Sequence, residues 1–157
     1  MLENQVLSIS FNRADKMNAI TRAMYGQLAD ELNSADQEFG IRAVILTSEG
    51  DHFTAGNDIT DFLEHPPTSQ DSTVSKFLSA LHNFSKPLIA AVKGNAVGVG
   101  STMLLHCDIV TASESARFSF PFASLGLVPE AGSSLLLPRL VGHHRAAELF
   151  QIGRAHV

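Results

Sequence analysis

The sequence contains a single cysteine, Cys107, among its 157 residues. One thiol excludes an internal disulfide and fits a reducing compartment. Positive charge is also scarce: 11 Lys and Arg stand against 16 Asp and Glu, for a formal net charge of −5, and there is no basic run. This balance disfavours a nucleic-acid partner, so any anionic ligand must be held by local groups.

Long apolar runs are missing as well, since no segment approaches the ~20 consecutive apolar residues of a membrane span. Residues 1–13 mix acidic and polar residues with apolar ones, unlike the apolar core of a signal peptide. We therefore expect a cytoplasmic protein with no membrane partner. The 45% of apolar residues suffices for one globular core, and the length fits one domain.

Strand and helix patterns alternate along the chain. Period-two alternation predicts a half-buried strand at Val6–Phe11, and short apolar runs predict two strands covered on both faces, at 41–48 and 87–94. Apolar residues at helical spacing predict helices over 18–36 and 77–84. A further strand pair is predicted at 108–113 and 116–120. Such alternation favours an α/β fold with functional groups on the loops that leave strand ends.

Three loops combine glycine with polar residues. In the first loop, "HFTAGNDITDF" (52–62), Gly56 permits an unusual backbone angle, and Asp58 can cap a short helical turn. In the second loop, "KGNAVGVGSTMLLHCD" (93–108), glycines lead into an apolar helical run. A helix that begins near Gly98 would offer its first, unpaired N–H groups to a ligand oxygen.

The third loop, "LGLVPEAGSS" (125–134), contains the carboxylate of Glu130. We expect Pro129 and Glu130 in the first turn of a helix, with Leu127, Val128 and Leu135 around the carboxylate. Pro followed by Glu is common at this position, because proline suits the first helical residue and a carboxylate suits the positive end of the dipole. On spacing alone, Glu130 is therefore a structural residue.

Several other sites fit the residues poorly. "GVGSTM" lacks the third glycine and the distant acid of a dinucleotide site, and no lysine follows the glycines as in a phosphate loop. Ser101 is not in the G-x-S-x-G elbow of a nucleophilic serine. No histidines have the spacing of metal ligands, so we expect no metal site.

The segments "FTAGND", "AAVKGNAVGVGSTMLLHCDIVTASESARFSFPF" and "LGLVPEAGSS" together resemble the crotonase, or enoyl-CoA hydratase/isomerase, superfamily over residues 6–151. The resemblance implies an enzyme built as a spiral of ββα units that binds an acyl-CoA thioester. Coenzyme A would enter as part of the substrate, with no separate cofactor. Relatives continue into a C-terminal helical region that completes the pocket and forms homo-oligomers, trimers or dimers of trimers.

By position, the resemblance assigns an oxyanion hole to the backbone N–H groups of Asn57 and Val99. Hydratases of the superfamily hold a water between two glutamates, whose positions carry Thr102 and Phe122 here. Glu130 instead matches the single glutamate of 3,2-enoyl-CoA isomerases of the peroxisomal type. One carboxylate is sufficient for that reaction, because it can take the C2 proton and return it at C4.

The resemblance also implies a set of substrate-binding residues. They are Lys16, Ala19, Ala55, Gly56, Asp58, Ile59, Gly98, Pro121 and Phe122.

We therefore predict an acyl-CoA isomerase that uses Glu130, Asn57 and Val99. A hydratase or another crotonase-type reaction, and an inactive acyl-CoA-binding fragment, are the alternatives.

The chain divides into a core domain at 1–151, incomplete at both ends, and a tail at 152–157. The tail "IGRAHV" is the translation of ATC GGA AGA GCA CAC GTC, a common sequencing adapter. We expect it to be read-through from a gene fragment, which the underlying nucleotides would reveal.

Overall fold

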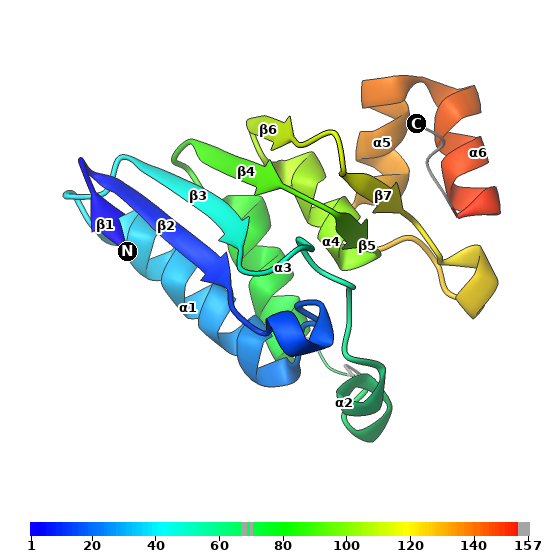
Figure 1. Cartoon of the computed structure of the whole chain (residues 1–157), viewed down its shortest axis with the longest axis horizontal. Helices are drawn as coiled ribbons and strands as arrows, with labels where there is room; N and C mark the ends of the chain where they lie inside the picture. Colours follow the sequence, from blue (N-terminus) through cyan, green and yellow to red (C-terminus); the bar gives the residue numbers. More distant parts are fainter. Residues whose placement is uncertain (67–68, 70, 154–157) are drawn as a thin grey trace.

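The computed structural model describes residues 1–66, 69 and 71–153 (Figure 1). The strands are β1 (Leu2–Glu3), β2 (Val6–Phe11), β3 (Ala43–Ser48), β4 (Leu88–Val92), β5 (Asn95–Val97), β6 (Ile109–Ala112) and β7 (Arg117–Ser119). The α-helices are α1 (Arg22–Gln37), α2 (Ile59–Glu64), α3 (Thr73–Asn83), α4 (Val99–Thr102), α5 (Ser133–Val141) and α6 (His143–Ile152). Short 3₁₀-helices are η1 (Ala14–Lys16), η2 (Met103–His106) and η3 (Ala123–Leu125).

Two sheets organise the chain. The larger has the order β1-β2-β3-β4-β6, and only the β1–β2 pair is antiparallel. The smaller pairs β5 with β7 in parallel. The predicted strand pair at 108–113 and 116–120 is therefore wrong as a pair: both segments form strands, but β6 lies beside β4 and β7 lies beside β5. Each strand extends a different layer.

The predicted ββα units are present. In the last two units, β4, β5 and α4 are followed by β6, β7 and α5. Isolated parallel bridges continue the smaller layer into the earlier units, joining Ile20 to Asn57 and Thr54 to Ala96. Each unit thus sends one strand to the large sheet, one segment to the small layer and then a helix. This arrangement confirms the α/β fold and places the ends of the second segments next to one another.

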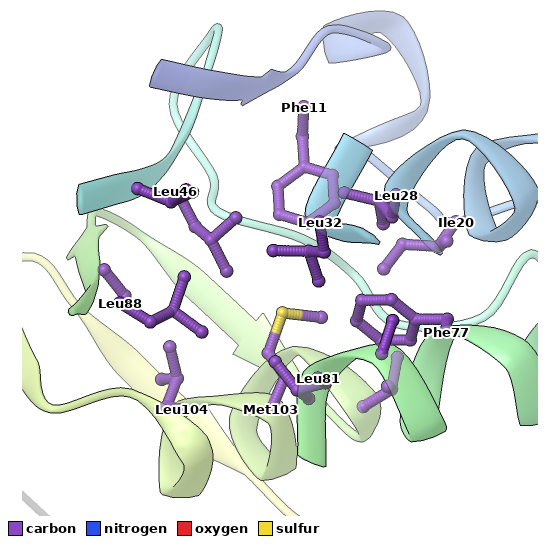
Figure 2. Packing of buried hydrophobic residues seen from close by; sticks show 14 of the residues in the cluster. Phe11, Ile20, Leu28, Leu32, Leu46, Phe77, Leu81, Leu88, Met103 and Leu104 are labelled. Atoms are coloured by element: carbon purple, nitrogen blue, oxygen red, sulfur yellow. The ribbon is translucent and has the colours of Figure 1, made fainter. Parts of the chain in front are cut away.

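The main core lies between the large sheet and helices α1 and α3, which pack against each other (Figure 1). Figure 2 shows Leu32 and Phe77 from these helices facing Leu46 and Leu88 of the sheet. The helix predicted over 18–36 begins later, at Arg22, because the Thr21 hydroxyl accepts from the Met24 N–H at 3.3 Å and caps it.

The prediction that β3 and β4 are covered on both faces is wrong. Their side chains alternate between buried and half-buried, so only one face of the sheet lies against the core. In β3, Val44 and Leu46 are buried, whereas Ala43 and Ile45 are half-buried. The apolar runs suggested two covered faces because alanine and isoleucine, at Ala43, Ile45, Ile89 and Ala91, occupy the less covered face too.

A second, smaller cluster lies at the far end of the chain. Its buried members are Phe120, Phe122, Leu137, Ala146 and Leu149, from the segment after β7 and from α5 and α6. Among the described residues, no helix is both long and apolar enough to cross a membrane.

The predicted tail at 152–157 is described only in part, since residues 154–157 lie outside the described residues. Ile152 ends α6, and the Gly153 carbonyl accepts from the Phe120 N–H at 2.9 Å and from the Ser119 hydroxyl at 2.8 Å. The origin of the tail stays a prediction.

Candidate functional site

A buried asparagine anchors the first loop. Asn18 donates from Nδ2 to the carbonyl oxygens of Glu49 and His52 at 2.9 and 2.8 Å. The Asn18 carbonyl accepts from the Thr54 hydroxyl at 2.7 Å, and Thr54 Oγ1 accepts from the Gly56 N–H at 3.0 Å. Asn18 and Thr54 are both fully buried, and all these polar groups are paired, so the loop has a fixed conformation.

Gly56 turns the first loop toward the site. Its φ is +87°, and a Cβ there would lie 2.8 Å from the Val97 carbonyl oxygen, so only glycine fits. The next residue is Asn57, whose backbone N–H donates to no residue that the structure describes. An N–H left without a protein partner is available to a ligand oxygen.

The second loop makes a similar turn at Gly98, with φ 55° and ψ −117°. The Gly98 N–H donates to the Ser119 carbonyl at 2.9 Å, and its own carbonyl accepts from the N–H groups of Ser101 and Thr102. Helix α4 therefore begins at Val99, as predicted near Gly98, and the Val99 N–H has no acceptor within the described ranges. Because α4 has only four residues before η2, this single N–H matters more than a helix dipole.

The two unpartnered N–H groups lie at the same end of adjacent segments. The Thr54 N–H donates to the Asn95 carbonyl, and the Val97 N–H donates to the Thr54 carbonyl, both at 3.0 Å. Three residues beyond Thr54 lies Asn57, and two beyond Val97 lies Val99. Because the two segments run in parallel, both free N–H groups follow the same end of the small layer.

The third loop differs from its prediction. Pro129 and Glu130 do not form the first turn of a helix, because α5 begins only at Ser133. Ala131 and Gly132 have φ values of 53° and 64°, which interrupt any helix there. The Glu130 carbonyl accepts from the Ser133 N–H at 2.9 Å and from the Ser133 hydroxyl at 2.6 Å, which fastens the loop to α5.

The carboxylate of Glu130 points into the molecule. Its Oε1 accepts from the Thr102 hydroxyl at 2.9 Å, which places it beside the helix that begins at Val99. Burial raises the pKa of Glu130, and the hydrogen bond from Thr102 lowers it in part. The residues predicted to surround the carboxylate, Leu127, Val128 and Leu135, are exposed, and its hydrogen-bond partner is the buried Thr102.

Tyr25 of α1 connects the acid to the first loop. Its buried phenol donates to Oδ1 of the Asn57 side chain. Burial raises the pKa of Tyr25, and the negative charge of Glu130 raises it further. The Glu130 carboxylate thus hydrogen-bonds Thr102, three residues after Val99, and its charge acts on Tyr25, which bonds the Asn57 side chain. Sequence patterns gave no signal for Tyr25, which resembles any buried aromatic residue of a helix.

Asp58 links the first loop to the start of the chain. As predicted, its side chain caps α2, accepting from the Asp61 N–H at 3.1 Å. Arg13 donates to Asp58 at 2.6 Å and to the Ala19 carbonyl at 3.0 Å. The hydrogen bond from Arg13 is the largest of the effects that lower the pKa of Asp58.

Most of the predicted substrate-binding residues lie in this region. The Ala55 N–H donates to the Met17 carbonyl at 2.9 Å, which brings Ala55 next to η1 and the exposed Lys16. Ile59 begins α2 and is exposed.

Pro121 and Phe122 follow strand β7. Pro121 is half-buried, and the Phe122 ring packs into the second cluster. They follow Ser119, whose carbonyl accepts from the Gly98 N–H at 2.9 Å, and their role in binding stays a prediction.

A cavity of about 290 Å³ opens on the Asn57 side of the site. Its apolar walls come from Ile20, Phe62 and Val74, and Tyr25 and Asn57 also line it. The other lining residues are Arg22, Asp61, His65, Pro66, Ser72 and Thr73. The sequence gives no local sign of this cavity, because its walls come from α1, α2, α3 and the segments beside them, which meet only in the folded chain. In the described part of the chain, no three His, Cys, Asp or Glu side chains gather as metal ligands would.

Comparison with known proteins assigns the family. The family model described as "Enoyl-CoA hydratase/isomerase" matches residues 2–156. The chain therefore belongs to the enoyl-CoA hydratase/isomerase family, whose members share the crotonase fold.

Relatives carry both hydratase and isomerase names. The chain is 40% identical over 144 residues to "Enoyl-CoA hydratase ACTT3" of Alternaria alternata, covering 90% of this chain and 49% of the relative. It is 36% identical over 159 residues to "Enoyl-CoA delta isomerase 2" of Homo sapiens, covering 97% of this chain and 40% of the relative. The chain thus spans about half the length of the curated relatives it matches.

Solved structures show the same fold at high similarity. The Pseudomonas aeruginosa protein OdaA is 52% identical with a TM-score of 0.94, covering 98% of this chain and 62% of that one. An enoyl-CoA hydratase/isomerase from Pseudoalteromonas atlantica T6c is 51% identical with a TM-score of 0.94, covering 98% and 61%.

Proposed function

We propose that the chain carries the catalytic core of an acyl-CoA isomerase that moves a double bond from C3 to C2 of an enoyl-CoA. The observation that supports this most directly is the hydrogen bond from Thr102 to the half-buried carboxylate of Glu130, three residues after the unpartnered N–H of Val99. The second unpartnered N–H is that of Asn57. Two donors aimed at one thioester oxygen are the arrangement that stabilises an enolate.

The chemistry needs only these groups. Glu130 removes a proton from C2, and the electron pair of the broken C–H bond forms a dienolate whose negative oxygen accepts from Asn57 and Val99. The pair then returns through the conjugated system, and protonated Glu130 gives the proton back at C4. Because burial raises the pKa of Glu130, the carboxyl group gives up and regains a proton more evenly near neutral pH.

Thr102 favours isomerisation over hydration. It occupies the position of the first hydratase glutamate in the superfamily pattern, and its hydroxyl is bonded to Glu130. The second position carries Phe122, whose ring is buried in the second cluster. Neither residue can share an activated water with Glu130 as a second carboxylate would.

The substitution Glu130→Gln tests the function. We expect 3-enoyl-CoA conversion to fall at least a hundredfold, since a general acid–base group contributes that order of rate, while binding of the CoA thioester is kept. The matched control is Glu114→Gln, an exposed carboxylate near β7, which should leave turnover unchanged.

Other outcomes identify the alternatives. Full turnover by Glu130→Gln would reject the isomerase mechanism. Addition of water to a 2-enoyl-CoA by the unaltered chain would assign a hydratase. Binding of the thioester with no turnover at all would assign an acyl-CoA-binding fragment. The trimeric assembly and cytoplasmic location inferred from the resemblance and composition remain proposals for the whole protein.

A further inference from the structure

Thr102 is a fully buried polar side chain in the middle of the candidate site. It is the last residue of α4, three residues after Val99, and its exposed fraction is 0%. A buried hydroxyl must find a partner, because leaving it unpaired costs about 1–3 kcal/mol. Two acceptors are available: Glu130 Oε1 at 2.9 Å and, at a poorer distance of 3.4 Å, the Val99 carbonyl.

The shorter bond goes to the carboxylate. A hydroxyl has one proton, and the charged acceptor at 2.9 Å makes the stronger hydrogen bond of the two. The other carboxylate oxygen, Oε2, accepts from no group that the structure describes. One oxygen of Glu130 is therefore held and the other is free for chemistry.

We propose that Thr102 is a positioning residue that holds Glu130 through Oε1 and leaves Oε2 directed toward the substrate. The inference rests on the proposed function of Glu130 and deepens it. Thr102 lies on the helix that begins with the Val99 donor, so the same short element carries an oxyanion donor and fixes the acid. The spacing between donor and acid is thereby set within α4 and does not depend on the exposed part of the third loop.

The groups that face Glu130 determine the expected pH effect. Thr102 of α4 donates to it, and its charge acts on Tyr25 of α1. The His106 ring of η2 bonds the carbonyl of the next residue, Ala131, at 2.8 Å. Of these, the Thr102 hydroxyl stabilises the charged form of Glu130 and lowers its pKa. Removing the hydroxyl therefore raises the pKa of Glu130, and the acidic limb of the rate profile moves to higher pH.

The test compares Thr102→Val, which keeps the shape and removes the hydroxyl, with Thr102→Ser, which keeps the hydroxyl. In the valine variant we expect kcat for 3-enoyl-CoA to fall roughly tenfold, the loss that follows from one charged hydrogen bond, with KM little changed. The titration of the Glu130 side-chain carboxyl, followed by NMR of isotope-labelled glutamate, should move to higher pH. The serine variant should restore both.

The controls separate this inference from the function itself. Thr111→Val removes a hydroxyl that donates to the Ala90 carbonyl at 3.3 Å on the edge strand β6, and it should change neither readout. The NMR titration reports on the Thr102–Glu130 contact even in a chain without turnover, whereas the proposed function is tested by turnover, through Glu130→Gln and the two substrates. An unmoved Glu130 titration in Thr102→Val overturns the inference. Should the valine variant not fold, Thr102→Ala against Thr102→Ser gives the same comparison.

Discussion

The two apolar clusters of the molecule differ greatly in size. The main cluster has 22 buried residues between the sheet and α1 and α3, whereas the second has five, around α5 and α6. Both free N–H groups belong to loops anchored in the main cluster, and Val99 is itself one of its members. Glu130 comes from the third loop, where Leu125, Leu127 and Val128 are exposed.

The first loop and Glu130 of the third loop therefore differ in how they are held. The first loop, with its free Asn57 N–H, is fixed by buried polar contacts such as those of Asn18 and Thr54, and a mutation there disturbs the core as well. Glu130 is fixed by a few local contacts, those of Thr102 and Ser133. The stability of the fold should therefore depend mostly on the contacts of the first loop. The position of Glu130 should depend on individual hydrogen bonds.

The largest expected effect is on the free energy of unfolding, when one leucine is shortened in each cluster. Leu46→Ala in the main cluster should lower the free energy of unfolding by about 4 kcal/mol, and Leu149→Ala in the second by about 2 kcal/mol. The physical reason is that the smaller cluster has fewer neighbours around the cavity and can collapse into it. Urea unfolding measures both. Equal losses would show that the second cluster is packed as firmly as the first.

The next effect is the loss of stability when alanine replaces either of two glycines that have open space around them. Gly98→Ala should cost about 3 kcal/mol, because its φ of 55° with ψ of −117° is a conformation that only glycine adopts readily. Gly126→Ala should cost about 1 kcal/mol, because φ 65° and ψ 27° lie in the left-handed region that other residues can enter.

The two glycine variants should also differ in kcat. Gly98→Ala moves the peptide that carries the Val99 N–H, so kcat should fall further than the loss of folded protein explains. Gly126→Ala, in the exposed part of the third loop, should leave kcat within about twofold. Thermal unfolding and steady-state rates provide the two measurements, and equal losses of kcat would contradict the difference between the loops.

The smallest effect concerns the ion pair that fastens the first loop. Because Arg13 lowers the pKa of Asp58 below 3.8, this carboxylate adds stability that is present above that pH and is lost as the pH falls through the folded-state pKa. Asp58→Asn should therefore lower the urea midpoint slightly at neutral pH, and the difference from the unaltered chain should shrink in acid. Arg13→Gln should give the same pattern. A difference independent of pH would show that the cap on α2, and not the ion pair, is responsible.

Patterns local in the chain were predicted well. The strand at Val6–Phe11, the cap of Asp58 on α2 and the start of α4 after Gly98 are confirmed. Each depends on residues within one turn or one strand. The placement of Pro129 and Glu130 in a helix failed because Ala131 adopts a positive φ that its sequence gives no reason to expect.

Contacts between distant segments could not be predicted. Asn18 and Tyr25 reach the first loop from positions 34 and 32 residues before their partners, and Thr102 meets Glu130 across 28 residues. A threonine or tyrosine in a helix has no local mark that distinguishes a partner of an active carboxylate from an ordinary buried residue. The family resemblance supplied the donors and the acid but no account of what holds them.

The sequence by itself determined the family, the alternation of strands and helices, and the glycine turns before Asn57 and Val99, because these follow from local residue patterns and from backbone angles that favour glycine. The tertiary structure decided that β6 and β7 join different layers, that Glu130 is hydrogen-bonded by Thr102 and that its charge acts on Tyr25. The physical reason is that hydrogen bonds, charges and burial act through space, and the distances they depend on exist only once the ββα units have packed together.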